Sequence, residues 1–106
     1  MKITKIQELD KLPLAFDGRC MYSGEKAEII HITLQPGEKI PLHSNPDTIL
    51  FFIIEGSGLL ETELNTILVK KGSCVFLEPG ELRGWKNTGT ENLLLLVIKI
   101  RSKLDH

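Results

Sequence analysis

The sequence predicts an all-β domain, and three observations support this class. From residue 27 onward, apolar runs rich in Ile, Leu, Val and Phe recur about every ten residues. Glycine and proline separate the runs, as turns between strands require. No stretch after residue 27 keeps the 3.6-residue apolar period of an amphipathic helix. With 106 residues the chain forms one domain around one core, and an antiparallel sandwich or barrel fits this pattern.

The first 26 residues differ from the remainder of the chain. They contain the one helical candidate, IQELDKL, in which Ile6, Leu9 and Leu12 share a helix face before Pro13 ends the pattern. The preceding MKITKI alternates in polarity, as a β-strand does. We therefore expect residues 1–26 to form an N-terminal strand or short helical segment.

Strand-like runs follow in order, each bounded by a turn. They are AEIIHITL (27–34), TILFFIIE (48–55), the hairpin LLETELNTILVKKG (59–72) with its turn near Leu64-Asn65, SCVFLE (73–78) and LLLLVIKI (93–100). Fully apolar runs such as ILFFII need cover on both faces, which a closed barrel that pairs with a second copy provides. We predict a barrel over residues 27–101 and a C-terminal tail over residues 102–106.

Composition and charge exclude several classes of partner. The formal net charge of −1 and the lack of any basic run give no electrostatic reason to expect nucleic acid or an anionic membrane. The longest apolar stretches hold six residues, too few to span a bilayer, and the polar start differs from a signal peptide. Cys20 and Cys74 lie far apart, in no metal-binding or redox spacing, so reduced thiols and a cytoplasmic location are expected.

Two motifs marked by glycine and proline organise the predicted barrel. In the first motif, Gly37 is followed by five residues and then by His43, which occupies the first histidine position. Gly56 closes this motif. Residues 72–87 match Gly, a Pro-Gly turn and a later Asn, with one extra residue before the proline. The chain resembles the cupin family over residues 30–98, about two thirds of its length. The resemblance implies a double-stranded β-helix, or jelly-roll barrel, that forms a homodimer. It also implies an exchange of N-terminal strands, so we expect residues 1–26 to contact a second copy.

The resemblance also implies where a metal would bind. The resemblance implies a metal centre whose ligands are three histidines and one glutamate inside the barrel. In this sequence only His43 keeps the residue type of its ligand position. Asn45 stands at the second histidine, Ile49 at the glutamate and Arg83 at the last histidine. An arginine cannot lose its proton to become a ligand. We therefore expect no cofactor, while zinc, nickel, iron or manganese held by His43 and other ligands stays an alternative.

A pocket inside the barrel is the alternative to a metal site. Alternate strand residues share a face, and the resemblance implies that residues 43, 45, 83 and 85 point inward. The predicted pocket residues are His43, Asn45, Asp47, Phe51, Arg83 and Trp85. The guanidinium of Arg83 is suited to a carboxylate or phosphate. The first hypothesis is therefore a binding or sensor module for a small polar or anionic ligand.

Each of these residues also has a structural interpretation. Arg83 pairs with Asp47 or Glu81 at the barrel mouth if no ligand is involved, because a buried cation requires a partner. Trp85 packs in the core if it contacts no ligand. Asp47 lies in the sequence NPD, which is also ordinary turn chemistry.

Two further functional classes stay open. The resemblance also implies an enzyme of the isomerase, epimerase or lyase type, in which His43 would act as general base because the ordinary pKa of histidine lies close to working pH. A variant of this class holds a metal weakly through His43, Asp47 and waters. If His43 is merely a satisfied interior histidine bonded to Asn45 or Thr48, an inert structural homodimer is the remaining class.

Overall fold

The computed structural model describes residues 1–102, so most of the predicted tail 102–106 lies outside the described residues. The described chain forms one three-residue 3-10 helix, η1 (Ile6–Glu8), and nine strands. The strands are β1 (Asp17–Ser23), β2 (Ala27–Leu34), β3 (Lys39–His43), β4 (Thr48–Glu55), β5 (Ser57–Thr62), β6 (Thr66–Lys70), β7 (Cys74–Leu77), β8 (Arg83–Lys86) and β9 (Leu93–Ile100). Within residues 1–102, no helix has the length and apolar character needed to cross a bilayer.

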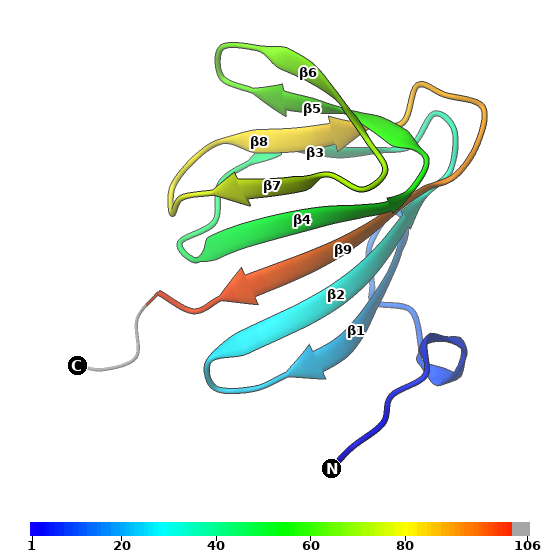
Figure 1. Ribbon diagram of the computed structural model, residues 1–106, viewed down its shortest axis with the longest axis vertical. Coiled ribbons are helices and arrows are strands. Elements are labelled where there is room, and N and C mark those ends of the chain that lie inside the picture. The colour runs from blue at the N-terminus through cyan, green and yellow to red at the C-terminus, as the bar shows by residue number, and fades with distance from the viewer. Residues whose placement is uncertain (103–106) are drawn as a thin grey trace.

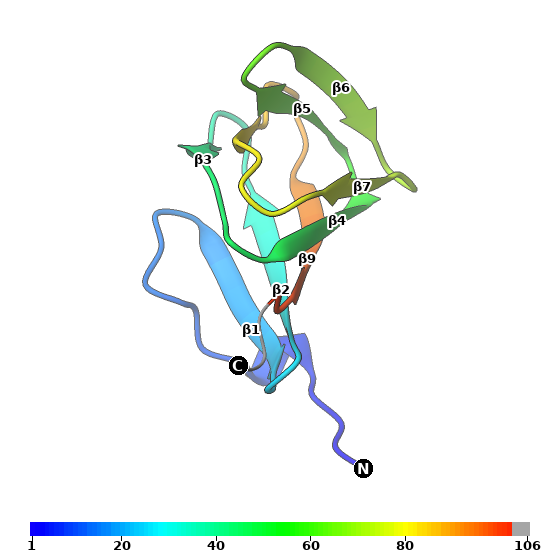
Figure 2. The same cartoon turned by 90° about the vertical axis from the view of Figure 1, so that its left-hand side faces the viewer.

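Two antiparallel sheets face each other. The larger has the strand order β1-β2-β9-β4-β7, and the smaller has the order β3-β8-β5-β6 (Figure 1). The chain passes repeatedly from one sheet to the other, and the view in Figure 2 shows the two layers spreading apart toward β1 and β3. The predicted all-β class is confirmed.

The apolar runs form strands at the predicted residues. Strands β2, β4 and β9 cover residues 27–34, 48–55 and 93–100. The predicted hairpin turns between β5 and β6, where the backbone N–H of Thr62 donates to the carbonyl of Asn65 at 2.8 Å. The buried residues of β2, β4 and β9 alternate along each strand and face the opposite sheet. The apolar runs located these strands because turn residues bound each run.

The core lies between the sheets and centres on Trp85, which is fully buried. The Trp85 ring meets the ring of Phe51 edge to face, with centroids 5.4 Å apart. Gly58 makes room for the indole, because a Cβ there would lie 2.5 Å from Leu93 Cδ2 and 3.1 Å from Trp85 Cε3. Phe51 belongs both to this packing and to the wall of a cavity between the sheets.

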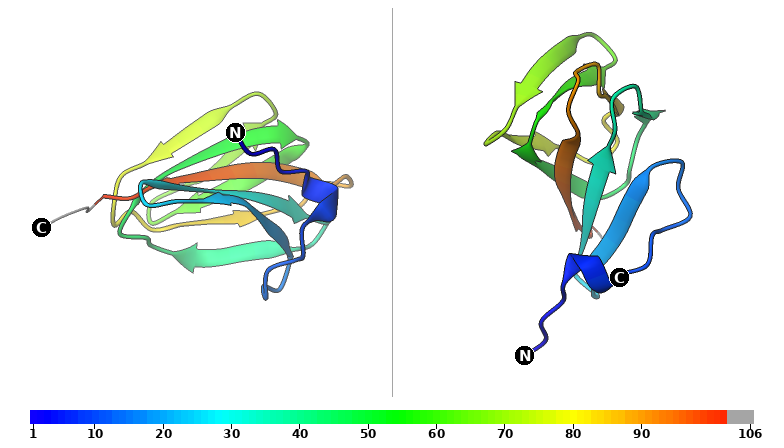
Figure 3. Two further views of the ribbon diagram at one scale, coloured as in Figure 1. Left: turned by 90° about the horizontal axis from the view of Figure 1, so that it is seen from below. Right: turned by 90° about the vertical axis from the view of Figure 1, so that its right-hand side faces the viewer.

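The N-terminal segment forms less helix than the pattern IQELDKL predicts. Helix η1 ends at Glu8, Leu9 is extended, and none of the three helical residues is buried. A single turn without a packed face has little to stabilise it beyond its own hydrogen bonds. The guanidinium of Arg19 in β1 holds the turn by donating to the carbonyls of Ile6 and Leu9. Figure 3 shows the path of the chain from the N-terminus through this turn to β1.

Strand β1 also belongs to the segment 1–26 and pairs with β2 along the edge of the larger sheet. Arg19 forms an ion pair with Asp17 at 3.1 Å, and this contact lowers the pKa of the Asp17 carboxyl. The chain between η1 and β1 contributes residues 12–14 and Phe16 to the wall of the cavity.

Candidate functional site

A cavity of about 610 Å³ opens between the two sheets. Most of its wall is apolar and comes from β2, β3, β4, β9 and residues 12–16 of the N-terminal segment. The polar residues of the wall are Glu28, His43, Asn45, Arg83 and Lys99. A concave, mainly apolar site with a few polar groups is typical of small-molecule binding, and this volume suits a ligand of modest size.

Arg83 is the most unusual residue of this wall because it is a buried cation. The residue is 3% exposed. Its Nη1 donates to the carbonyl of His43 at 3.1 Å, and its guanidinium carbon lies 5.9 Å from the centre of the Phe51 ring. Its Nε has no hydrogen-bond partner among residues 1–102. Burial lowers the pKa of this guanidinium from its ordinary value, because desolvation disfavours the charged form.

The carboxylates that the sequence offered as partners of Arg83 are engaged elsewhere. Asp47 Oδ2 lies 3.9 Å from Nη1 of Arg101, and Glu81 Oε2 accepts from the backbone N–H of Glu78 at 2.7 Å. Across residues 1–102, no carboxylate lies within ion-pair distance of Arg83. The cavity therefore contains a cationic group whose charge is not balanced by the described part of the protein.

His43 reaches the cavity through an irregularity in β3. The pairing register with β8 shifts between Ile40 and His43, and this shift places His43 opposite Arg83. Gly84 permits the close approach, since a Cβ there would lie 2.7 Å from the Ile40 carbonyl oxygen. His43 is exposed at the cavity mouth, and its Nδ1 lies 2.8 Å from the carbonyl oxygen of Pro41. It makes no hydrogen bond to Asn45 or Thr48, the two partners considered for an interior histidine.

Asn45 lies beyond the end of β3, so the alternation argument that linked residues 43 and 45 does not apply. The Asn45 side-chain oxygen accepts from the backbone N–H of Asp47 at 2.8 Å, and its carbonyl accepts from Gly80 at 2.9 Å. These bonds form a turn that fixes the loop before β4. Asn45 still lines the cavity, because the turn follows directly after His43.

The structure brings four of the six predicted pocket residues together and leaves two outside. His43, Asn45, Phe51 and Arg83 line the cavity. Trp85 does not, because its indole is enclosed by core packing, and its Nε1 has no hydrogen-bond partner within residues 1–102. Asp47 does not, because its carboxylate faces Arg101 and the backbone of Ser102. No carboxylate of the described chain therefore orients the His43 ring.

Sequence reasoning missed two charged residues of the wall, Glu28 and Lys99. The Lys99 Nζ lies 3.6 Å from Glu28 Oε1 across the β2–β9 ladder. The sequence contained a signal for both residues. Glu28 lies on the same strand face as the core residue Ile32, and Lys99 lies on the same strand face as Val97. A charged residue on the strand face that carries the core residues indicates a polar site beside the core.

The donor set does not fit a metal of the kind held by related barrels. Asn45 uses its side-chain oxygen in a turn, Ile49 is buried and apolar, and Arg83 presents a cation. Within residues 1–102, no three His, Cys, Asp or Glu side chains gather where they could hold an ion. A divalent ion beside His43 would also face the guanidinium charge without a protein carboxylate to offset it.

Comparisons with known proteins agree with this fold. A family model described as the cupin domain matches residues 30–99. Among curated proteins, a 5-nitrosalicylic acid 1,2-dioxygenase of Bradyrhizobium sp is 31% identical over 65 residues, which cover 61% of this chain. The chain spans 31% of the length of that relative.

Solved structures show the same likeness at lower identity. A predicted oxalate decarboxylase from Thermotoga maritima superposes with a TM-score of 0.87 at 21% identity, covering 94% of this chain and 99% of that one. A cupin family protein with a double-stranded β-helix fold from Methanocaldococcus jannaschii gives a TM-score of 0.82 at 22% identity, covering 95% and 91%. The predicted double-stranded β-helix is therefore confirmed, and these identities support the fold alone.

Proposed function

This chain belongs to the cupin family, and from that premise we propose that it binds a small carboxylate in its cavity without a metal. The observation that carries the proposal is the buried guanidinium of Arg83, whose charge has no carboxylate partner among residues 1–102. A buried cation without a counter-charge is costly, and an anionic ligand supplies that counter-charge. The protein is thus a binding or sensor module.

The groups around Arg83 support a carboxylate rather than a neutral ligand. Arg83 lines the cavity, and the guanidinium N–H groups that it does not donate to the His43 carbonyl are suited to carboxylate oxygens. The Nε atom is itself buried and has no partner among residues 1–102. Phe51 lies beneath the guanidinium, so this end of the cavity is also apolar. His43 and Asn45 stand beside it on the same wall and offer further hydrogen bonds.

The apolar remainder of the wall supports an organic acid with an apolar body. The curated relative carries in its name an aromatic acid, 5-nitrosalicylic acid. Aromatic carboxylates are therefore suitable first probes for this chain. The proposal assigns the protein to the cytoplasm, in keeping with its two free cysteines, Cys20 and Cys74.

Catalysis by His43 is the alternative function. His43 lines the same cavity, which favours a role toward a bound ligand. A general base needs a ring held in one orientation, and here the ring contacts a backbone carbonyl rather than a carboxylate. Binding is therefore the function that the geometry supports better.

The test is isothermal titration of the purified protein with benzoate and with 5-nitrosalicylate. Arg83→Met keeps an apolar stem beside Phe51 but removes the charge, and we expect it to weaken binding at least about tenfold. Lys71→Ala is the control, because it removes an exposed cation that does not line the cavity. Unchanged affinity in Arg83→Met would contradict the proposal.

Metal independence is tested on the same samples. We expect benzoate affinity to be unchanged after dialysis against a chelator, and we expect elemental analysis to find less than stoichiometric zinc, nickel, iron or manganese. Loss of binding on chelation, restored by one of these ions, would instead establish metal-dependent binding and contradict the proposal.

A further inference from the structure

Glu28 and Lys99 form a second charged group in the cavity, on the wall that faces Arg83. Both belong to the larger sheet, where register pairs them across β2 and β9, whereas Arg83 belongs to the smaller sheet. Their side chains are only 22% and 26% exposed, and Nζ lies 3.6 Å from Oε1. Arg83, Glu28 and Lys99 line the same cavity, so a ligand that fills the cavity lies against all three side chains.

The charges of the wall can be counted. Arg83 and Lys99 are cations and Glu28 is an anion, so these three side chains sum to 2 − 1 = +1. Lys99 is already compensated by Glu28, whereas Arg83 has no carboxylate within residues 1–102. One negative charge on a ligand therefore neutralises the cavity. A second one at the far end meets Glu28, and like charges in a partly desolvated site repel.

We propose that Glu28 makes this cavity selective for monocarboxylates over dicarboxylates, by engaging Lys99 and repelling a second anion. The ligand then carries one carboxylate toward Arg83 and an apolar body with an uncharged far end toward Glu28 and Lys99. This inference rests on the proposed function, because it presumes that Arg83 holds the first carboxylate. It adds a residue that sets specificity and a chemical class for the ligand.

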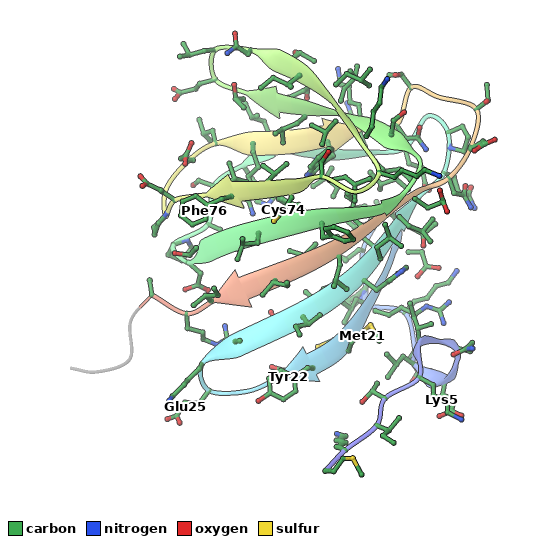
Figure 4. All side chains as sticks on the ribbon, viewed as in Figure 1. Lys5, Met21, Tyr22, Glu25, Cys74 and Phe76 are labelled. Atoms are coloured by element: carbon green, nitrogen blue, oxygen red, sulfur yellow. The ribbon has the colours of Figure 1, made fainter. Side chains whose placement is uncertain are left out.

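The probes are monomethyl terephthalate and terephthalate, which share one shape and differ in the charge at the far end. We expect the native protein to bind the monoester at least about tenfold more tightly than the diacid. Glu28→Gln leaves Lys99 without its partner, so the diacid should gain affinity until the preference is lost or reversed. Glu25→Gln is the matched control, since Glu25 lies exposed in the β1–β2 turn and outside the cavity (Figure 4).

A second variant keeps the inference testable if Glu28→Gln does not fold. Lys99→Gln leaves the Glu28 carboxylate without its cation, so the preference for the monoester should increase. Titrations at about pH 8, above the ordinary pKa of histidine, keep imidazole charge out of the comparison.

The outcomes separate this inference from the proposed function. If both probes bind and the ratio of their affinities is the same in native protein, Glu28→Gln and Lys99→Gln, the role of Glu28 is wrong while carboxylate binding stands. If neither probe binds the native protein, the proposed function fails and this inference fails with it. A shift of the ratio in opposite directions in the two variants supports the inference.

Discussion

Asn87 joins three parts of the barrel through one buried amide. Its Nδ2 donates to the carbonyls of Leu34 and Glu91, both at 2.8 Å, and its Oδ1 accepts from the backbone N–H of Gly89 at 3.0 Å. The residue is 1% exposed. Its amide thus satisfies the end of β2 and the loop that leads into β9, where water has little access.

Asn87→Ala should lower the free energy of unfolding by about 3 kcal/mol, because it leaves buried backbone groups without partners. Urea unfolding followed by circular dichroism measures the change. Asn92→Ala is the matched control, since Asn92 is exposed in the same loop and should cost less than about 0.5 kcal/mol. Equal losses of unfolding free energy in the two variants would show that the hydrogen bonds of Asn87 do not stabilise the fold.

Single residues of the site were predictable where a motif position fixed their direction. Arg83 was expected inside the barrel from its place in the second motif, and it lines the cavity. The direction of Trp85 was also inward, but its packing against Phe51 and Gly58 depends on side-chain shapes that no motif encodes. The ion pair of Lys99 depends on strand register, which single-strand periodicity does not give.

Among the elements, the pairing of β3 with β8 has the greatest effect on the site. The register shift between Ile40 and His43 turns His43 toward Arg83, and Gly84 lies against the shifted backbone. Without the shift, the register that pairs Ile40 with Trp85 would have placed Leu42 opposite Arg83. The irregular backbone of β3 therefore makes His43 the partner of Arg83, whose guanidinium donates to the His43 carbonyl.

Gly84→Ala tests this account of the β3–β8 contact. The added Cβ would lie 2.7 Å from the carbonyl oxygen of Ile40 and 3.0 Å from the backbone nitrogen of Leu42, so one strand must move. We expect a loss of about 1–3 kcal/mol in unfolding free energy and weaker benzoate binding. Gly89→Ala, where the nearest atom to an added Cβ is 3.5 Å away, is the control. Native-like benzoate affinity in Gly84→Ala would mean that the site does not depend on this approach.

Whole elements were predictable when their sequence pattern was uninterrupted. Strands β2, β4 and β9 have the predicted bounds because their apolar runs end at turns. Strand β1 has the mixed sequence DGRCMYS, which carries no clear alternation, and it is held by pairing with β2. The helical pattern of the N-terminal segment predicted too much helix. The helix η1 has only three residues, because its apolar side chains have no surface to pack on.

At the scale of the whole molecule, the outer face of the larger sheet is unusually apolar. Phe52 in β4, Phe76 in β7 and Tyr22 in β1 do not line the cavity and are 40%, 58% and 54% exposed. Figure 4 labels Phe76 and Tyr22 on this sheet. Register places Phe52 beside Leu96, so the apolar surface continues across β9. A contiguous apolar face on a sheet is typical of a subunit contact, and a second copy with the same face is the simplest partner.

The predicted homodimer is tested by light scattering at tens of micromolar, where ordinary dimers of this kind are assembled. We expect about twice the chain mass of 11.9 kDa. Phe52→Glu places a charge at the middle of the apolar face and should yield monomer, because burying an unpaired charge is costly. Leu64→Glu is the matched control, since Leu64 is 90% exposed in the β5–β6 turn.

If native protein is monomeric, the homodimer is wrong. If Phe52→Glu stays dimeric, the contact lies elsewhere, and the predicted contact through residues 1–26 is the next to be tested, by a similar charge at the exposed Ile3.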